Sequence, residues 1–399
     1  MSRAHRRSLL LSFALAACGC GRQGPAVESP VDRPREPSPT GQRLVYIAGS
    51  TKKVCQLTGD LDRQTGRPTR SLTNQRAGVR ATDLGSSFEH DGRLVFLFGD
   101  THGKPGDRDA LASTISRDPE QIDLDFLRGD DGTWRPLEVP GVSLGAFEVP
   151  SHGVSLGGKM YVLFTTDHTP QRTMGRSVLA VSTDGGRQFR RLYDFSTTHF
   201  INVAFWKSDD WLYAFGSGEY RRSSVRLARI RPADVERAAA WEYLADAGPD
   251  GMPRWSHAQP DAAPLFHHDV VGELSVAYCP SVERYVLLYN SGEPRGIVMR
   301  SAAQPWGPWS DAAIIFDPWQ DGGYGHFLHI AAGFRPAEDG LSDPGREAEW
   351  GGEYGPFVMP RYTTGNAACC RIYYTMSTWN PYQVVVMQSD LRLEAEHTD

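Results

Sequence analysis

Two aspartates, Asp83 and Asp100, stand at mirrored positions around one short turn. If Asp91-Gly92 is a two-residue hairpin turn, residue 90 pairs with residue 93, and position 83 falls opposite position 100. The Cβ atoms of directly opposed residues lie about 4.5–5.5 Å apart, so the two carboxylates would face each other at the end remote from the turn. Such a pair is costly unless one acid stays protonated. A proton donor beside an ionised carboxylate is the arrangement that hydrolyses glycosidic bonds.

This interpretation of the hairpin has two alternatives. A bulge at Gly85 or Gly99 would shift the register, and both aspartates could simply cap turns. Glu148 and Asp167 mirror each other in the same way across the next predicted hairpin. Mirrored acids alone therefore do not define a site.

Three further polar residues adjoin predicted strands and are expected to contact a substrate. His152 begins an inner strand, Glu219 follows its strand much as Asp100 follows its own, and Glu273 precedes another strand. For Glu219 the alternative is a solvated loop residue beside two arginines. For Glu273 the alternative is an ion pair with Arg300 that locks the sheet.

Aromatic residues are abundant, and Tyr324, Tyr354 and Trp379 are predicted to be stacking platforms for sugar rings. His326 and His329 are poor zinc co-ligands, because residues three apart on a strand face opposite sides. No cofactor is predicted. The alternative is a structural Ca²⁺ held by oxygens near the centre of the fold, for which the sequence has no recognisable ligand loop.

The elements that position these residues are strands. Five runs of apolar, aromatic and β-branched residues each follow a turn or short loop. They are 93–98, 159–164, 211–215, 284–289 and 371–375. With their neighbours they form five irregular antiparallel units, which predicts an all-β fold, a five-bladed β-propeller; a pair of β-sandwiches is the alternative. We expect strand 44–47 to close the ring against the last unit, and one short helix at 232–243.

Two motifs are interpreted as structural. The run 182–189 contains Asp184 and resembles the Asp-box of sialidase-type propellers, in which the aspartate caps a turn on the outer rim. The run 306–310, Trp-Gly-Pro-Trp-Ser, is typical of a rigid aromatic turn that closes a blade.

The N-terminus predicts export. Residues 1–17 combine basic residues with a short apolar stretch, and Leu15-Ala-Ala-Cys18 resembles a bacterial lipobox. The resemblance implies cleavage before Cys18 and lipidation of that cysteine; an ordinary signal peptide is the alternative. Residues 18–42 are expected to be a disordered, Pro-rich tether, and residues 43–399 the propeller. We therefore expect a location in the cell envelope, lipid-anchored to a bacterial membrane and facing the periplasm or the exterior.

Charge and cysteine content limit the possible partners. The net charge is −6, with 42 basic and 48 acidic residues, so nothing indicates nucleic-acid binding. We expect a monomer that binds a polysaccharide. Cys369 and Cys370 cannot easily bridge to each other, so one of them could reach Cys55 or Cys279.

Five short motifs occur in an order that resembles a propeller family long catalogued as a domain of unknown function. They are Thr82-Asp-Leu-Gly85, Phe98-Gly-Asp-Thr101, Gly272-Glu-Leu-Ser-Val276, Trp306-Gly-Pro-Trp-Ser310 and Tyr374-Thr-Met-Ser-Thr-Trp-Asn-Pro-Tyr382. Some actinobacterial and gut-bacterial members of that family are endo-D-arabinofuranases, which cut the D-arabinan of mycobacterial cell walls. The resemblance spans residues 81–391 and implies that Asp83 and Asp100 are the catalytic pair.

Two classes of function follow. The first is an exported glycoside hydrolase that cleaves an extracellular polysaccharide, acting within chains on D-arabinofuranosyl linkages. The second is a noncatalytic surface lipoprotein whose funnel binds a glycan or a protein. Paired acids favour the enzyme, whereas a funnel blocked by the polar segment 338–349 would favour the binder.

Overall fold

The computed structural model describes residues 41–247, 251–292, 295–331, 333, 339–343, 346 and 349–395. The predicted signal peptide, the lipidation site Cys18 and nearly all of the predicted tether lie outside these residues. Strands dominate the described part, and its α-helix α1 is short (Thr73–Ala77). Among the described residues, we find no helix with the length and apolar character needed to cross a membrane.

The described strands form five antiparallel sheets in chain order, which we call blades 1 to 5. Blade 1 contains β3 (Val79–His90), β4 (Arg93–Gly103), β5 (Arg108–Thr114) and β6 (Asp125–Phe126). Blade 2 contains β7 (Pro150–Leu156), β8 (Lys159–Thr166), β9 (Arg176–Ser182) and β10 (Arg190–Ser196). Blade 3 contains β11 (Asn202–Lys207), β12 (Leu212–Ser217), β13 (Arg226–Ile230), β14 (Glu242–Asp246) and β15 (Arg254–Ser256).

The last two blades complete the set. Blade 4 contains β16 (Leu274–Cys279), β17 (Arg284–Gly292), β18 (Arg295–Ala302) and β19 (Ala313–Phe316). Blade 5 contains β20 (Glu353–Val358), β21 (Thr364–Asn366), β22 (Cys369–Thr378) and β23 (Gln383–Ala395), together with β1 (Gln42–Tyr46) and β2 (Lys52–Gln56) from the other end of the folded chain.

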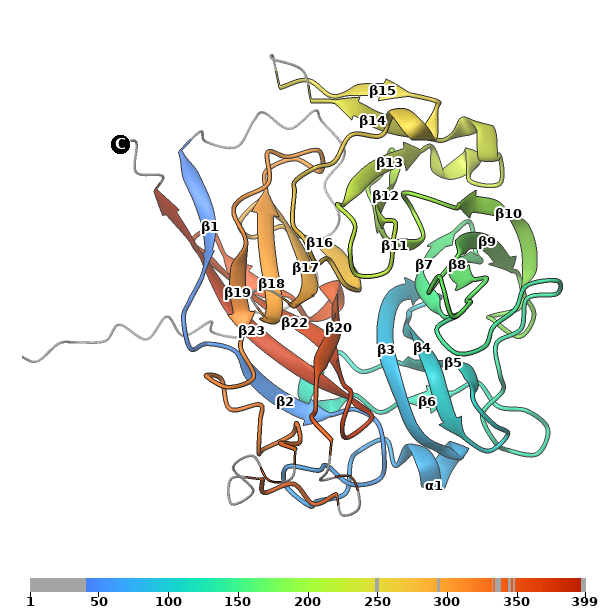
Figure 1. Cartoon of the computed structure of the whole chain (residues 1–399), viewed down its shortest axis with the longest axis vertical. Coiled ribbons are helices and arrows are strands. Elements are labelled where there is room, and N and C mark those ends of the chain that lie inside the picture. The colour runs from blue at the N-terminus through green and yellow to red at the C-terminus, as the bar shows by residue number, and fades with distance from the viewer. Residues whose placement is uncertain are drawn as a thin grey trace, which may run out of the picture. The chain divides into compact units, whose positions relative to one another are not determined.

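The first strand of each blade contacts the first strand of the next, and β20 contacts β3, so the five inner strands close a ring (Figure 1). This arrangement is a β-propeller, as predicted, and it excludes the pair of sandwiches. The predicted closing strand is also confirmed, since β1 pairs with β23 from Gln42 opposite Ala395 to Tyr46 opposite Leu391.

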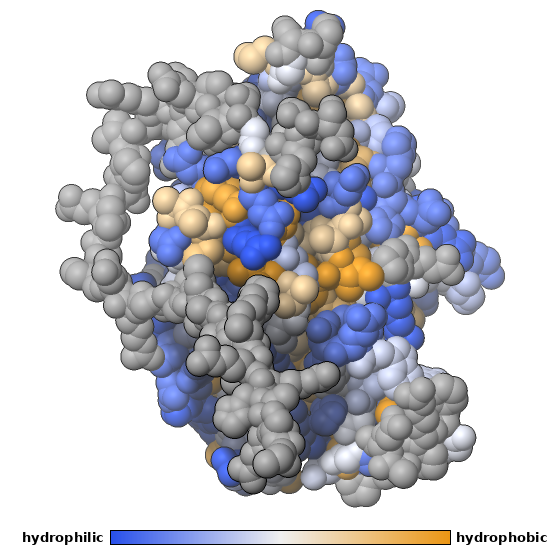
Figure 2. All heavy atoms as spheres, turned by 90° about the vertical axis from the view of Figure 1, so that its left-hand side faces the viewer, coloured by the Kyte–Doolittle hydropathy of each residue, from blue (hydrophilic) through white to orange (hydrophobic). Residues whose placement is uncertain are grey.

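Apolar side chains fill the spaces between the blades. Five buried clusters each join one pair of neighbouring blades, and a sixth lies where the inner strands meet. In β4, residues 94–98 are all apolar because they are buried on both faces: Phe96 and Phe98 face blade 5, whereas Val95 and Leu97 face blade 2. A strand that is buried on both faces has no polar alternation. On the face in Figure 2, by contrast, hydrophilic side chains predominate and apolar ones gather near the centre.

The helix predicted at 232–243 is wrong. The segment forms two 3₁₀ turns, Pro232–Asp234 and Ala238–Ala240, and β14 begins at Glu242. The alanines favour a helix, but Trp241 and Tyr243 are buried between blades 2 and 3, and this packing outweighs local propensity.

The predicted Asp-box turn behaves as a structural cap. The Asp184 carboxylate accepts hydrogen bonds from the Ser182 hydroxyl (2.8 Å) and from the Gln188 backbone N–H (3.0 Å). The aromatic turn holds Trp309 in the cluster between blades 3 and 4, where its ring meets Phe215 edge-on.

The described cysteines are Cys55, Cys279, Cys369 and Cys370, and no disulfide joins any two of them. The thiol of Cys370 lies within hydrogen-bonding reach of Cys279, between blades 4 and 5. Of the two partners that the sequence left open, the fold therefore brings Cys279 to this residue.

Candidate active site

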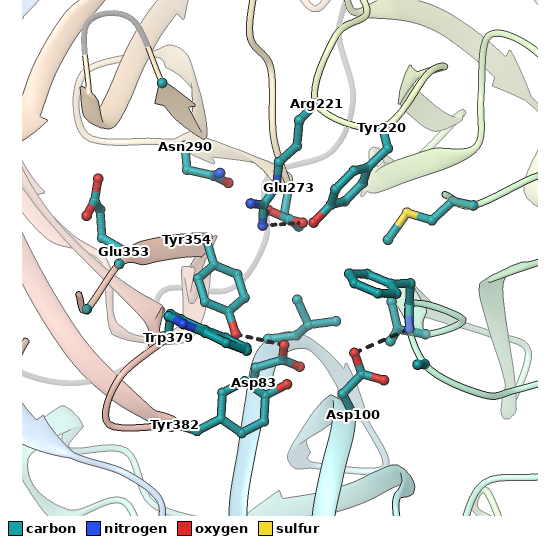
Figure 3. A pocket seen from close by; sticks show the side chains of 18 of the residues that line it. Asp83, Asp100, Tyr220, Arg221, Glu273, Asn290, Glu353, Tyr354, Trp379 and Tyr382 are labelled. Atoms are coloured by element: carbon teal, nitrogen blue, oxygen red, sulfur yellow. Dashed lines mark hydrogen bonds and ion pairs between the residues drawn. The ribbon is translucent and has the colours of Figure 1, made fainter. Parts of the chain in front are cut away.

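Near the ring of inner strands, the propeller contains a cavity of about 1070 Å³ (Figure 3). Residues from all five blades line it. They include Asp83 and Asp100 of blade 1, Phe147 and Met174 of blade 2, Tyr220 and Arg221 of blade 3, Glu273, Asn290 and Arg295 of blade 4, and Glu353, Tyr354, Trp379 and Tyr382 of blade 5. The predicted polar segment 338–349 contributes Glu349 to this wall, and part of it lies outside the described residues.

The hairpin that carries the aspartates has the predicted turn. Asp91 and Gly92 both have positive φ (47° and 75°), as a type I′ turn requires, and His90 pairs with Arg93. The predicted register continues as far as Ser86 opposite Leu97. Gly85 then adds an extra residue to β3.

Because of this bulge, Asp83 lies opposite Gly99 and the predicted direct opposition to Asp100 is wrong by one residue. The bulge falls at one of the two glycines that the sequence had indicated. Gly99 also makes room for the carboxylate, since a Cβ there would lie 3.0 Å from Asp83 Oδ1. Asp83 and Asp100 therefore lie close together on adjacent strands but are not directly opposed.

Backbone strain is concentrated around the cavity. Nine described non-glycine residues have positive φ, and five of them line the cavity: Leu84, Asp100, Phe147, Met174 and Arg221. At Leu84 the strained backbone is held by a 2.7 Å hydrogen bond from its N–H to the Ser377 hydroxyl. Such residues persist where the surrounding structure over-determines them, which is common at active sites.

Asp83 is buried, with 6% of its surface exposed. The Tyr354 hydroxyl donates to Oδ2 at 2.8 Å, whereas Oδ1 has no hydrogen-bond partner in the described structure. Burial and the nearby charge of Asp100 raise the pKa of Asp83 to about 7. Hydrogen bonds from the hydroxyl groups of Tyr382 and Tyr354 lower this pKa, but they have the smaller effect. This carboxyl group can therefore carry a proton near neutral pH.

Asp100 is the more exposed partner. Its carboxylate accepts a long hydrogen bond (3.4 Å) from the Phe147 N–H, and its own N–H donates to Asp109 Oδ1 at 3.2 Å. Burial raises the pKa of Asp100 above its usual value. Asp109 is buried behind it, and burial together with the Asp100 charge raises the pKa of Asp109 strongly. Within the described residues, none of these three acids pairs with a lysine or arginine.

Glu273 lies across the cavity and is as buried as Asp83, with 5% of its surface exposed. Arg221 Nη2 donates to both of its carboxylate oxygens, at 3.0 and 3.1 Å. The guanidinium also packs against the rings of Tyr220 and Tyr354. The predicted alternative partner, Arg300, instead donates to the Tyr289 hydroxyl at 3.0 Å, so that pairing is wrong.

Of the residues predicted to bind substrate, Glu273, Tyr354 and Trp379 line the cavity. Tyr324 lies beside it and packs against Trp350, which lines it.

The structure does not place His152 or Glu219 at the cavity. His152 is a buried core residue: Nδ1 donates to the Gly153 carbonyl at 2.9 Å, the ring meets Phe205 edge-on, and burial lowers its pKa to about 4. Glu219 sits on an exposed loop, 3.9 Å from Arg222, which matches the solvated alternative. Neither position supports the predicted contact with substrate.

Sequence reasoning missed several residues of the site. In the sequence, Arg221 is recognisable only as a neighbour of Glu219, and Tyr382 only as the last residue of a family motif. Asp109 and Trp350 carried no signal, since one follows an unremarkable turn and the other lies in a polar segment.

Metal-binding groups are not evident at the site. In the described ranges, no group of three or more His, Cys, Asp and Glu side chains could hold a metal ion. The buried His329 instead bridges two carboxylates, with Nδ1 2.9 Å from Asp339 and Nε2 3.4 Å from Asp343.

Comparisons with known proteins show a family and relatives that this chain resembles. The sequence profile described as "Domain of unknown function (DUF4185)" matches residues 69–388. Notoamide biosynthesis cluster protein J from Aspergillus sp. (strain MF297-2) is 29% identical over 331 residues, covering 71% of this chain and 80% of the fungal protein.

Two solved structures illustrate the structural likeness. A Bacteroides ovatus protein provisionally assigned as a hydrolase has a TM-score of 0.55 and 14% identity, covering 79% of this chain and 87% of that one. A GH43_1 enzyme from Xanthomonas citri has a TM-score of 0.44 and 13% identity, covering 78% and 88%. At such low identity, the likeness to the Bacteroides protein concerns the fold alone.

Proposed function

The chain belongs to the DUF4185 family, and from that premise and the cavity we propose that it is a glycoside hydrolase that acts on a polysaccharide. The observation that carries the proposal is the acid pair. Asp83 has a pKa of about 7 and lies beside the more exposed Asp100, and no lysine or arginine of the described residues forms an ion pair with either one. A structural motif gains nothing from this arrangement, whereas a reaction that needs an acid and a base uses it directly.

The two aspartates have different roles in the proposed reaction. Asp83 holds the proton and donates it to the glycosidic oxygen as the bond to the leaving sugar breaks. Asp100 is ionised and either activates a water molecule or attacks the anomeric carbon. The Tyr354 hydroxyl orients the Asp83 carboxyl group, and the Phe147 N–H orients that of Asp100.

The cavity suits a sugar better than a strongly charged ligand. Two of its arginines, Arg221 and Arg295, are already paired with Glu273 and Glu353. Trp379 and Phe147 offer apolar ring faces, and Asn290 offers both a donor and an acceptor. We propose further that the enzyme acts within chains on D-arabinofuranosyl linkages. The five family motifs, including those that contain Asp83 and Asp100, support this substrate.

We also propose that the protein is a lipoprotein of the cell envelope, since a polysaccharide outside the cytoplasm requires an exported enzyme. The lipobox-like run that ends at Cys18 and the Pro-rich segment after it support this location. Metabolic labelling with a fatty acid tests it: the natural chain should be labelled, and a Cys18→Ser variant should not.

The decisive experiment is a polysaccharide panel with the fragment that begins at Gly41, including D-arabinan, L-arabinan, xylan and sialylated glycans. Oligosaccharides released from one polymer, and lost in both Asp83→Asn and Asp100→Asn, would support the hydrolase and identify its substrate. Release that survives both substitutions would overturn the choice of catalytic pair. Binding without cleavage would favour the noncatalytic glycan-binding protein instead.

A further inference from the structure

Exposed aromatic side chains gather at the mouth of the cavity. Among the described residues, the exposed large hydrophobic side chains include Phe147 (42%), Trp319 (43%), Trp350 (37%) and Trp379 (50%). Phe147, Trp350 and Trp379 line the cavity. An exposed aromatic side chain is unremarkable alone, but several at one opening indicate a binding surface.

Three of the aromatic rings form a continuous surface that we call the aromatic shelf: Trp319, Tyr324 and Trp350. Their ring centroids are 4.6 Å (Trp319–Tyr324), 5.4 Å (Tyr324–Trp350) and 5.8 Å (Trp319–Trp350) apart. Tyr324 is buried and forms the base, while the two tryptophans remain partly exposed above it. The Asp317 carboxylate accepts a hydrogen bond from the backbone N–H of Trp319 at 2.8 Å, which holds the first residue of the shelf in place.

The shelf is continuous with the cavity. Trp350 belongs to both, and the guanidinium of Arg295, another cavity residue, lies 5.6 Å from the centroid of the Tyr324 ring. Arg295 Nε donates to Glu353 at 3.2 Å, so these charges at the border compensate each other. The charges of Arg295 and Glu353 at the border between cavity and shelf thus do not oppose a neutral ligand that lies across it.

Aromatic rings also flank both acids. The backbone N–H of Phe147 donates to Asp100, so this cavity residue adjoins that acid. The Trp379 ring lies 5.7 Å from that of Tyr382, whose hydroxyl faces Asp83 (Figure 3). A ligand that stacks on rings at both sides of the acid pair extends past the reacting bond in both directions.

We propose that the aromatic shelf binds a neutral carbohydrate chain, holding sugar units that lie outside the cavity while the acid pair cleaves the chain at an internal bond. This inference rests on the proposed function. Flat sugar faces present C–H groups to the exposed rings, and the sugar hydroxyls stay in water at so open a site. The shelf thus explains how the enzyme would prefer polymers to short oligosaccharides.

The test compares Trp319→Ala and Trp350→Ala with a matched control, Trp211→Ala, because Trp211 lies in blade 3 and packs on Arg229 and Arg231. Each shelf substitution should raise KM for the polymer by about tenfold, which corresponds to about 1.4 kcal/mol. Because Trp319 lies outside the cavity, Trp319→Ala should affect the cleavage of the shortest substrate far less than that of the polymer. Trp350→Phe should retain most of the affinity, which separates loss of the ring from misfolding.

Binding to the same polysaccharides is measured separately, by affinity electrophoresis of Asp83→Asn combined with each shelf substitution. Retardation of Asp83→Asn that is lost in both shelf variants supports the shelf even if the natural chain cleaves nothing. Equal retardation of all variants, or retardation lost equally in Trp211→Ala, would overturn it. The proposed function fails on a different result, the absence of cleavage by the natural chain.

Discussion

Two carboxylates face the same cavity at nearly the same depth and have opposite surroundings. Asp83 and Glu273 are 6% and 5% exposed. Glu273 has both oxygens bonded to Arg221, whereas Asp83 has one hydroxyl on Oδ2, no partner on Oδ1 and a second acid beside it.

The difference shows that burial alone does not make a catalytic acid. A buried carboxylate with a cation stays ionised and holds the structure together, while one without a cation takes up a proton more readily. The blade 1 side of the cavity therefore has a carboxyl group that can carry a proton near neutral pH, whereas the opposite side has an ion pair between Arg221 and Glu273.

The largest expected effect is on catalysis. Asp83→Asn keeps the size of the side chain but removes the proton donor, and we expect the rate to fall about 10²–10⁴-fold. In Glu273→Gln, which leaves an acceptor for Arg221, the rate should fall much less. Initial rates on the polymer test this contrast, with melting temperatures as the control for folding. Equal losses of rate in the two variants would contradict the prediction.

The next largest effect is on stability. Arg221→Met leaves Glu273 buried without its cation, which should lower the free energy of unfolding by about 3–5 kcal/mol. The double variant Arg221→Met/Glu273→Gln should recover most of that loss, because no charge then remains unpaired. Urea denaturation measures both. A single variant as stable as the natural chain would show that the ion pair is not needed.

A smaller effect is expected on the pH profile. Activity should decline as pH rises through the Asp83 pKa of about 7, since the proton donor is lost, and as pH falls through the raised pKa of Asp100. The Tyr354 hydroxyl lowers the Asp83 pKa, so Tyr354→Phe should move the alkaline limb to higher pH. The logarithm of kcat/KM against pH tests this, and an unmoved limb would contradict Asp83 as the donor.

The smallest expected effect is a gain in the stability of Asp83→Asn, the variant that is expected to lose activity. The folded pKa of Asp83 is about 7, above the value of about 3.9 for an unfolded chain, so its ionisation costs stability progressively as pH rises between these values. Asp83→Asn removes that cost and should raise the melting temperature by several degrees at pH 8. Below about pH 4 the gain should vanish. Scanning calorimetry at both pH values measures this difference, and a gain of equal size at both would contradict the prediction.

Much of the fold could be predicted because its signals are local. Asp91-Gly92 specifies a type I′ turn, and the five apolar runs specify strands buried on both faces. The prediction of a helix at 232–243 was wrong because Trp241 packs between two blades, and local helix propensity contains no information about such tertiary packing.

The candidate site, too, has features that local sequence predicts and features that depend on tertiary contacts. The amino-acid sequence by itself determined that two aspartates flank one hairpin and that Glu273, Tyr354 and Trp379 adjoin other strands. Only the tertiary structure decided that a bulge at Gly85 offsets the aspartates, that Arg221 pairs with Glu273, and that His152 faces the core. The physical reason is that pKa values and ion pairs depend on burial and on neighbours brought by other blades, and no spacing within one hairpin contains that information.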